Sequence, residues 1–211
     1  MNTSTSMPAK EFDLQYAQEQ LRRSRNPLRR FVKAFYLRHT LKDALGPTID
    51  FGCGAGQLLK RLPKGSIGLE VNPHLIESLR RTGLQVRQAR AEIQDFDLAD
   101  FLVGAHKTLI IAHVLEHLPD PAAALLSLLA ACHRLEIERV IVIVPGVKGF
   151  AADRTHKTFV DSSYLETRIP QISSGFTRNR PSYFPGPWAS LGRMFTFHEM
   201  KVVFDRMDKN S

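Results

Sequence analysis

The chain has 211 residues, 43% of them hydrophobic, which allows one α/β domain with a sizeable core. Lys and Arg number 29 against 21 Asp and Glu, and the net charge of +8 favours anionic partners such as phosphorylated metabolites, RNA or acidic lipids. Two cysteines exclude a disulfide framework, and the lack of a long apolar run or a signal-peptide core predicts a cytoplasmic protein without a membrane span.

The first 45 residues are predicted to form a basic helical extension. Residues 1–42 contain nine basic and three acidic side chains, and apolar positions recur at helical spacing from about residue 12 to residue 45. Pro27 is expected to end one helix and open a second. An amphipathic helix docked on the rest of the chain explains this pattern, and a nucleic-acid-binding arm is the alternative. The predicted domains are therefore residues 1–45 and 46–211.

Short apolar or β-branched runs alternate with helical stretches in the next hundred residues, and this alternation predicts a parallel sheet with right-handed crossovers. Capping side chains precede prolines at Asn72-Pro73 and Asp120-Pro121, which indicates helix starts, and Gly83 is expected to close the first of these helices. The predicted strands are residues 48–51, 67–71, 84–88, 108–111 and 140–144.

The chain after Pro145 is expected to be irregular, with a helix at residues 162–168. Residues 175–183 and 195–204 look strand-like and are predicted to form an antiparallel hairpin at the sheet edge. The segment 180–192 between them is rich in proline and aromatic residues, which suggests that it covers a pocket. The predicted fold is α/β and Rossmann-like, with a doubly wound, mostly parallel seven-stranded sheet, an antiparallel C-terminal hairpin and N-terminal helices.

A glycine-rich turn follows the first predicted strand, which ends at Asp50. Gly52, Gly54 and Gly56 would let a ligand approach the backbone closely. Glu70 follows at the end of the second strand, where a carboxylate can accept both hydroxyls of a ribose; capping of the next helix is the alternative. Position 57 is Gln, where a dinucleotide fingerprint requires Gly or Ala, so the pattern favours an adenosine cofactor without a pyrophosphate.

The segments 50–56 (DFGCGAG) and 112–118 (AHVLEHL), with Glu70 between them, resemble the class I S-adenosylmethionine-dependent methyltransferase family over roughly residues 45–146. The resemblance implies that the glycine turn supports the methionine moiety, that Glu70 holds the ribose and that Ala112 and His113 face the methionine. Arg90 replaces an acidic residue that often contacts the adenine in that family, so the adenine contacts are expected at Ala91 and Glu92. The full predicted cofactor set is Asp50, Gly52, Cys53, Gly54, Gly56, Glu70, Val71, Ala91, Glu92, Ala112 and His113.

Three residues are candidates for catalysis. Residues 153–159 (DRTHKTF) resemble the Asp-x-Thr-His segment of bacterial methyltransferases that modify small molecules or sugars. If the acceptor is a hydroxyl, a histidine base can remove its proton, and His156 is the first candidate and His113 the second. Asp153 would orient His156 or act in its place, while a hydrogen bond from His156 to the loop backbone is the alternative.

Other side chains near these motifs are given structural roles. Glu116 and His117 are expected to be a pair that anchors a helix, and no metal site is predicted. Tyr164, Tyr183 and Trp188 are expected either to wall the acceptor pocket or to belong to the core.

The sequence therefore predicts an enzyme that transfers a methyl group from S-adenosylmethionine to an oxygen or nitrogen of a small, anionic or sugar-like acceptor. RNA methylation is the first alternative. An NAD-dependent oxidoreductase and a non-catalytic RNA-binding module are further alternatives, and the oligomeric state stays open.

Overall fold

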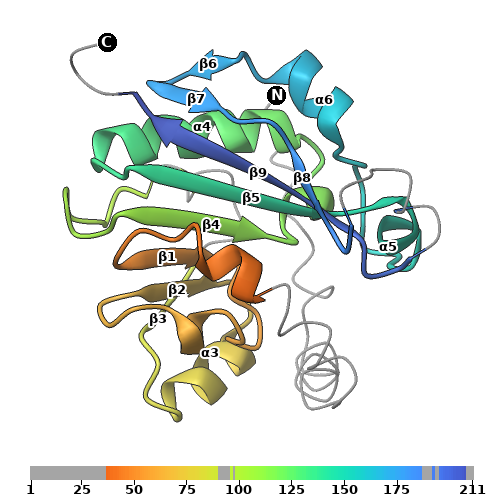
Figure 1. The fold of residues 1–211 in the computed structure, drawn as a ribbon. Coiled ribbons are helices and arrows are strands. Elements are labelled where there is room, and N and C mark those ends of the chain that lie inside the picture. Colours follow the sequence, from red (N-terminus) through yellow and green to blue (C-terminus); the bar gives the residue numbers. More distant parts are fainter. Residues whose placement is uncertain (1–36, 90–95, 97, 187–191, 193–194, 208–211) are drawn as a thin grey trace, which may run out of the picture.

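The computed structural model describes residues 37–89, 96, 98–186, 192 and 195–207 (Figure 1). The helices predicted between residues 12 and 36 lie outside the described residues, as do Ala91, Glu92 and Trp188. Residues 37–41 are helical, and the buried Leu37 packs among sheet residues that include Ile110 and Ile141. No helix in the described part of the chain is long and apolar enough to cross a membrane.

The parallel half of the sheet has the order β3-β2-β1-β4-β5 (Figure 1). All five predicted strands are confirmed, with ends that shift by at most two residues. Their bounds are β1 (Thr48–Phe51), β2 (Ile67–Glu70), β3 (Val86–Gln88), β4 (Thr108–Ala112) and β5 (Arg139–Pro145).

The antiparallel half differs from the prediction, because the C-terminal segment forms four strands and the described sheet has nine rather than seven. These are β6 (Ile172–Ser173), β7 (Phe176–Arg178), β8 (Ser182–Phe184) and β9 (Glu199–Arg206). Strand β9 does not lie at an edge: it pairs with β5 on one side and with β7 and β8 on the other. The strand-like run at 175–183 is interrupted before Pro181, which has no backbone N–H to donate to a ladder.

Besides the helical residues 37–41, the described α-helices are α3 (Pro73–Arg80), α4 (Pro121–Arg134), α5 (Val147–Ala151) and α6 (Ser162–Arg168). The predicted caps are present, since the side chains of Asn72 and Asp120 accept from backbone N–H groups of α3 and α4. Two short 3₁₀ helices, η1 (Leu59–Arg61) and η3 (Leu115–His117), follow β1 and β4. The glycine turn after β1 thus leads into a 3₁₀ turn rather than directly into an α-helix.

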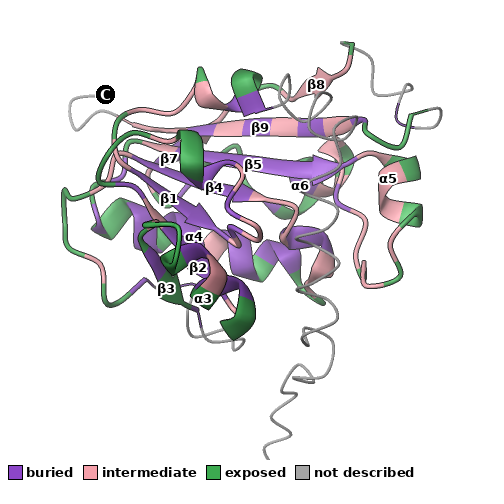
Figure 2. Ribbon diagram, turned by 90° about the horizontal axis from the view of Figure 1, so that it is seen from below, coloured by how far each residue is buried: buried purple, intermediate pink, exposed green. Residues whose placement is uncertain are grey.

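The central strands are buried on both faces, as the purple colouring of β4 and β5 shows (Figure 2). Side chains alternate between the two faces of a strand, so Leu109 and Ile111 pack with α4 while Ile110 packs with Leu37 and Leu58. Strands β1 and β4 are adjacent in the sheet although β2 and β3 lie between them in sequence. The strand order reverses here, and open α/β sheets bind ligands beyond the carboxyl ends of the strands at such a point.

Candidate active site

The glycine turn after β1 has a backbone that only glycine adopts easily. Gly52, Gly54 and Gly56 have φ values of +75°, +53° and +69°. A Cβ on Gly52 would lie 2.3 Å from Val114 Cγ2, and one on Gly56 would lie 2.6 Å from Leu79 Cδ2, whereas one on Gly54 would meet nothing within 4 Å. Gly52 and Gly56 therefore permit tight packing, and Gly54 borders open space that a ligand can occupy.

Glu70 at the end of β2 holds this turn in place. Its Oε2 accepts from the Gly54 backbone N–H at 2.8 Å, and its Oε1 accepts from the N–H groups of Val71 and Asn72 at 2.9 and 3.0 Å. Burial raises the pKa of Glu70, and these three backbone hydrogen bonds oppose that rise. Asn72, not Glu70, caps α3. The carboxylate thus connects the glycine turn to β2 beside the space at Gly54, which is compatible with the predicted ribose contact.

Asp50 and Cys53 lie beneath the turn and are buried. Cys53 Sγ packs against β2, since a Cβ on Gly68 would lie 2.6 Å from it. Burial raises the pKa of the Cys53 thiol well above its ordinary value, so the side chain is a neutral filler. Both predicted cofactor residues are therefore buried at the start of the turn, and Cys53 packs there against β2.

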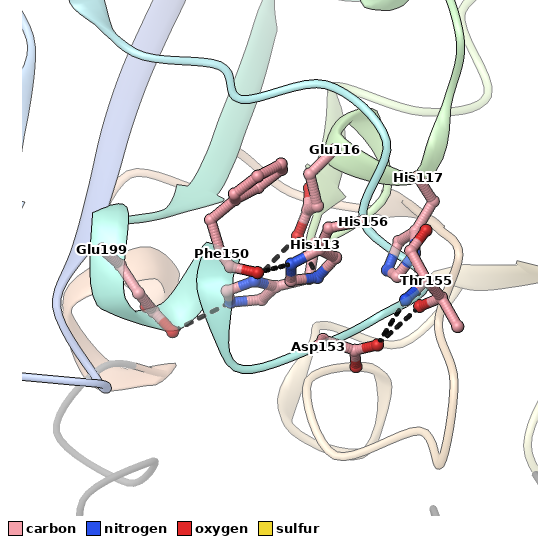
Figure 3. A network of polar contacts seen from close by, with 8 residues as sticks. All are labelled: His113, Glu116, His117, Phe150, Asp153, Thr155, His156 and Glu199. Atoms are coloured by element: carbon pink, nitrogen blue, oxygen red, sulfur yellow. Dashed lines mark hydrogen bonds and ion pairs between the residues drawn. The ribbon is translucent and has the colours of Figure 1, made fainter.

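His113, the first residue after β4, adopts the left-handed conformation with φ +56°, and its backbone N–H donates to the Ile143 carbonyl of β5. Its Nε2 lies 2.8 Å from Glu199 Oε1 and its Nδ1 3.3 Å from Glu116 Oε1 (Figure 3). Burial lowers the pKa of His113, but the two carboxylates outweigh it and raise the pKa to about 10. A protonated imidazole has no lone pair to accept a proton, which argues against His113 as the general base.

His156 lies in the loop after α5, with only 8% of its side chain exposed. Its Nδ1 is 2.8 Å from the Phe150 carbonyl, which accepts the Nδ1–H, so the predicted alternative of a backbone hydrogen bond is present. The ring stacks on Phe150 and meets His117 edge to face. Its Nε2 lies 3.8 Å from Glu116 Oε1.

Asp153 binds Thr155 rather than orienting His156 directly. Its Oδ1 accepts from the Thr155 backbone N–H at 3.0 Å and from the Thr155 hydroxyl at 2.7 Å. Burial tends to raise the pKa of Asp153, but these hydrogen bonds dominate and lower it. Asp153 is therefore a carboxylate at neutral pH that supports the loop next to His117.

Two acidic residues of this region were not predicted as site residues. Glu116 was interpreted as part of a helix anchor, but its side chain is fully buried between His113 and His156. Glu199 begins β9, 86 residues from His113 in sequence, and no local pattern marks it. Only the pairing of β9 with β5 brings it to the carboxyl end of β4.

A pocket adjoins Glu199 where β8 pairs with β9. It is lined by His39, Thr40, Ile143, Tyr183, Phe184 and Lys201, together with Ser182 and Glu199. Lys201 Nζ is bonded to the Asp43 carboxylate and lies 2.9 Å from His39 Nδ1. Of the predicted pocket aromatics, Tyr183 lines this pocket and Tyr164 packs against the main core.

The chain matches the family model of a methyltransferase domain over residues 49–135, the segment from β1 to the end of α4. It is 38% identical over 184 residues to a ubiquinone biosynthesis O-methyltransferase of Methylococcus capsulatus, covering 79% of this chain and 69% of that protein. A protein of the same name from Xanthomonas oryzae pv. oryzae is 29% identical over 151 residues, covering 66% of this chain and 59% of the relative.

Solved structures share the fold at low identity. A SAM-dependent methyltransferase from Archaeoglobus fulgidus superposes with a TM-score of 0.64 at 19% identity, covering 92% of this chain and 100% of that chain. The N-methyltransferase NodS from Bradyrhizobium japonicum, in complex with S-adenosyl-L-homocysteine, gives a TM-score of 0.60 at 17% identity, with coverages of 92% and 98%. With the glycine turn, Glu70 and the strand order, these matches show that the chain belongs to the class I S-adenosylmethionine-dependent methyltransferases.

Proposed function

We propose that this enzyme methylates a hydroxyl group on a small aromatic acceptor. The observation that carries the proposal is the pocket beside Glu199, which has the aromatic side chains Tyr183 and Phe184 in its wall and Lys201 in its lining. Aromatic side chains favour contact with a flat ring, whereas the ammonium of Lys201 is already paired with the Asp43 carboxylate and leaves the charge of the acceptor open. The names of the relatives support oxygen as the methylated atom and a quinone precursor as the type of acceptor.

The proposed cofactor site extends from the glycine turn to the end of β4. Gly54 leaves room for the cofactor, Glu70 accepts the ribose hydroxyls, and Ala112 and His113 border the methionine end. Val114 packs against Gly52, which joins the cofactor turn to the segment after β4. The adenine contacts proposed at Ala91 and Glu92 belong to a segment outside the described residues.

Methyl transfer requires alignment more than activation, because the sulfonium already makes the methyl group electrophilic. The acceptor oxygen forms a bond to the methyl carbon as the carbon–sulfur bond breaks, and the sulfur leaves as the neutral thioether of S-adenosylhomocysteine. The acceptor O–H proton must pass to a base. His156 is the proposed base, while His113, with Glu116 and Glu199 on either side, contributes positive charge near the reacting oxygen.

The proposal is tested by an acceptor screen with methyl-labelled S-adenosylmethionine. The panel contains catechols and hydroxybenzoates, the matching anilines, free sugars and a short RNA, and products are identified by mass. We expect label on a phenolic oxygen, and we expect Phe184→Ala to raise KM for the acceptor while the affinity for S-adenosylmethionine stays unchanged. Label only on nitrogen, on sugars or on RNA would refute the proposed acceptor class.

A further inference from the structure

Three side chains outside the proposed cofactor site converge beyond the carboxyl end of β4. Glu116, His117 and His156 each offer one ligand atom, and these three atoms lie within 4.8 Å of one another. Ligand atoms around a tetrahedral ion lie about 3.3 Å apart when metal–ligand bonds are about 2.0 Å long. The three atoms of this group are therefore at most about 1.5 Å farther apart than in a closed tetrahedral site. No other such group of three or more is found among the described residues.

Hydrogen bonds set the tautomer of both histidines so that Nε2 is the free nitrogen. His156 donates its Nδ1–H to the Phe150 carbonyl at 2.8 Å. The Thr155 hydroxyl donates its proton to Asp153, so it can only accept from His117 Nδ1, which lies 3.1 Å away. The Thr155 carbonyl, 3.3 Å from the same nitrogen, accepts as well. Metal-binding histidines are commonly oriented in this way, by a hydrogen bond from the second ring nitrogen to a carbonyl or a carboxylate-linked group.

Glu116 supplies the acidic ligand, and one of its carboxylate oxygens accepts no hydrogen bond in the described structure. Its side chain is fully buried, and its Oε2 has no hydrogen-bond partner among the described residues (Figure 3). An unpaired carboxylate oxygen inside a protein is costly unless an ion or a donor satisfies it. The other oxygen of this carboxylate, Oε1, lies 3.3 Å from His113 Nδ1, so only Oε2 lacks a partner. A bound cation would satisfy this orphaned oxygen.

We infer that Glu116, His117 and His156 bind a divalent transition-metal ion of the Zn²⁺ or Mn²⁺ type. Two imidazole nitrogens and one carboxylate oxygen suit such ions better than Mg²⁺ or Ca²⁺, which prefer oxygen ligands throughout. Three protein ligands leave a coordination position open for water or an acceptor hydroxyl, and an ion there lowers the pKa of that hydroxyl. The ion's role in methyl transfer rests on the proposed function, but its binding does not. In the metal-bound enzyme His156 would be a ligand and could not also be the base, so the proton of the activated hydroxyl would pass to solvent water. The role of base assigned to His156 above would apply to the metal-free enzyme.

Direct metal titration tests the inference without cofactor or acceptor. The full-length protein is stripped with a chelator and titrated by calorimetry with Zn²⁺, Mn²⁺, Mg²⁺ and Ca²⁺ separately, and Co²⁺ binding is followed by visible absorption. We expect one equivalent of Zn²⁺ to bind, Mg²⁺ and Ca²⁺ to bind much more weakly, and Co²⁺ to give the intense visible bands of a low-coordinate site. Zn²⁺ should also raise the thermal unfolding temperature.

His117→Gln and His156→Gln are the informative variants, because each removes one imidazole and keeps a polar side chain. Each should weaken Zn²⁺ binding at least about tenfold and abolish the visible Co²⁺ bands, while S-adenosylhomocysteine binding shows that the variant is folded. His133→Gln, at the exposed C-terminal end of α4, is the matched control and should bind like the wild type. Absence of a one-to-one complex in the wild type, a preference for Mg²⁺ or Ca²⁺, or unchanged binding in both variants would overturn the inference. Glu70→Ala should lower cofactor affinity only, which separates this test from that of the methyltransferase site.

Discussion

His113 connects β4 to β9 through its side chain, and this link is available only because Glu199 begins β9 opposite the end of β5. Its left-handed backbone turns the chain so that the imidazole contacts both Glu116 and Glu199. The residue was predicted from the family motif, but its two carboxylate partners were not. Its chemical character, a cation rather than a base, follows from those partners.

We expect Glu199→Gln to lower kcat/KM for the acceptor by roughly ten- to a hundredfold, since a hydrogen bond to a charged group contributes about 1.5–3 kcal/mol. The affinity for S-adenosylmethionine should not change, because Glu199 lies on the side of His113 that faces β9. Steady-state kinetics and cofactor titration measure the two quantities. Glu166→Gln, on the exposed face of α6, is the control. Equal losses in both variants would contradict the assigned role of Glu199.

We expect cofactor binding to depend on pH through the carboxyl group of Glu70. Its folded-state pKa is raised, chiefly by burial, and the ribose hydroxyls need the ionised carboxylate as acceptor. Affinity for S-adenosylhomocysteine should therefore be full above this raised pKa and fall as the pH drops through it, at higher pH than an ordinary glutamate would show. Calorimetric titrations across this pH range measure the effect. Glu70→Gln should bind more weakly at neutral pH, and a variant that kept the wild-type pH profile would show that another group titrates.

At the scale of elements, the glycines of the turn between β1 and η1 have two different roles: two of them permit close packing and one leaves space for a ligand. Gly52 and Gly56 make room for Val114 and Leu79, so their replacement disturbs packing. Gly54 has a positive φ but faces open space, so a side chain there meets the ligand rather than the protein. Alternate glycines were sufficient to predict the turn. Which of them pack against protein depends on the tertiary structure, because Val114, just before η3, and Leu79 of α3 lie next to Gly52 and Gly56.

Gly54→Ala should weaken S-adenosylhomocysteine binding at least tenfold, while the free energy of unfolding falls by only about 1–2 kcal/mol for the left-handed backbone. Gly83→Ala is a matched control, because Gly83 also has a positive φ and also has nothing within 4 Å of its Cβ position. The control should show the same loss of stability and normal affinity. Equal affinities of the two variants for S-adenosylhomocysteine would mean that the cofactor does not bind next to Gly54. Chemical denaturation and calorimetry supply both measurements.

For the whole molecule, the cofactor should stabilise the fold, because its proposed site joins the ends of β1, β2 and β4. A ligand that binds only the folded state adds about 2.7 kcal/mol to the free energy of unfolding when present at 100 times its Kd. For a chain of this length, that corresponds to a rise of roughly 5 to 11 °C in the unfolding temperature. Differential scanning calorimetry with S-adenosylhomocysteine measures it. NAD serves as the control ligand, and a comparable rise with NAD would mean that the turn does not select against a dinucleotide.

The amino-acid sequence by itself determined the parallel half of the sheet, the caps of α3 and α4 and the cofactor turn. Each of these depends on residues close together in the chain: buried strands as short apolar runs, helix starts as Asn-Pro and Asp-Pro, and the turn as alternate glycines. The C-terminal half was predicted in part. The antiparallel pairing of residues 175–183 with 195–204 is present as β7 and β8 on β9, but two strands were expected and four formed.

The tertiary structure alone decided what surrounds the reacting end of β4. Glu199 contacts His113, 86 residues away in sequence, because β9 pairs with β5. His156 lies near Glu116, 40 residues away in sequence, because of the course of the loop after α5. Side chains there are positioned by long-range packing, and no local periodicity encodes such contacts. The charge of His113, the free nitrogens of His117 and His156 and the orphaned oxygen of Glu116 are consequences of that packing.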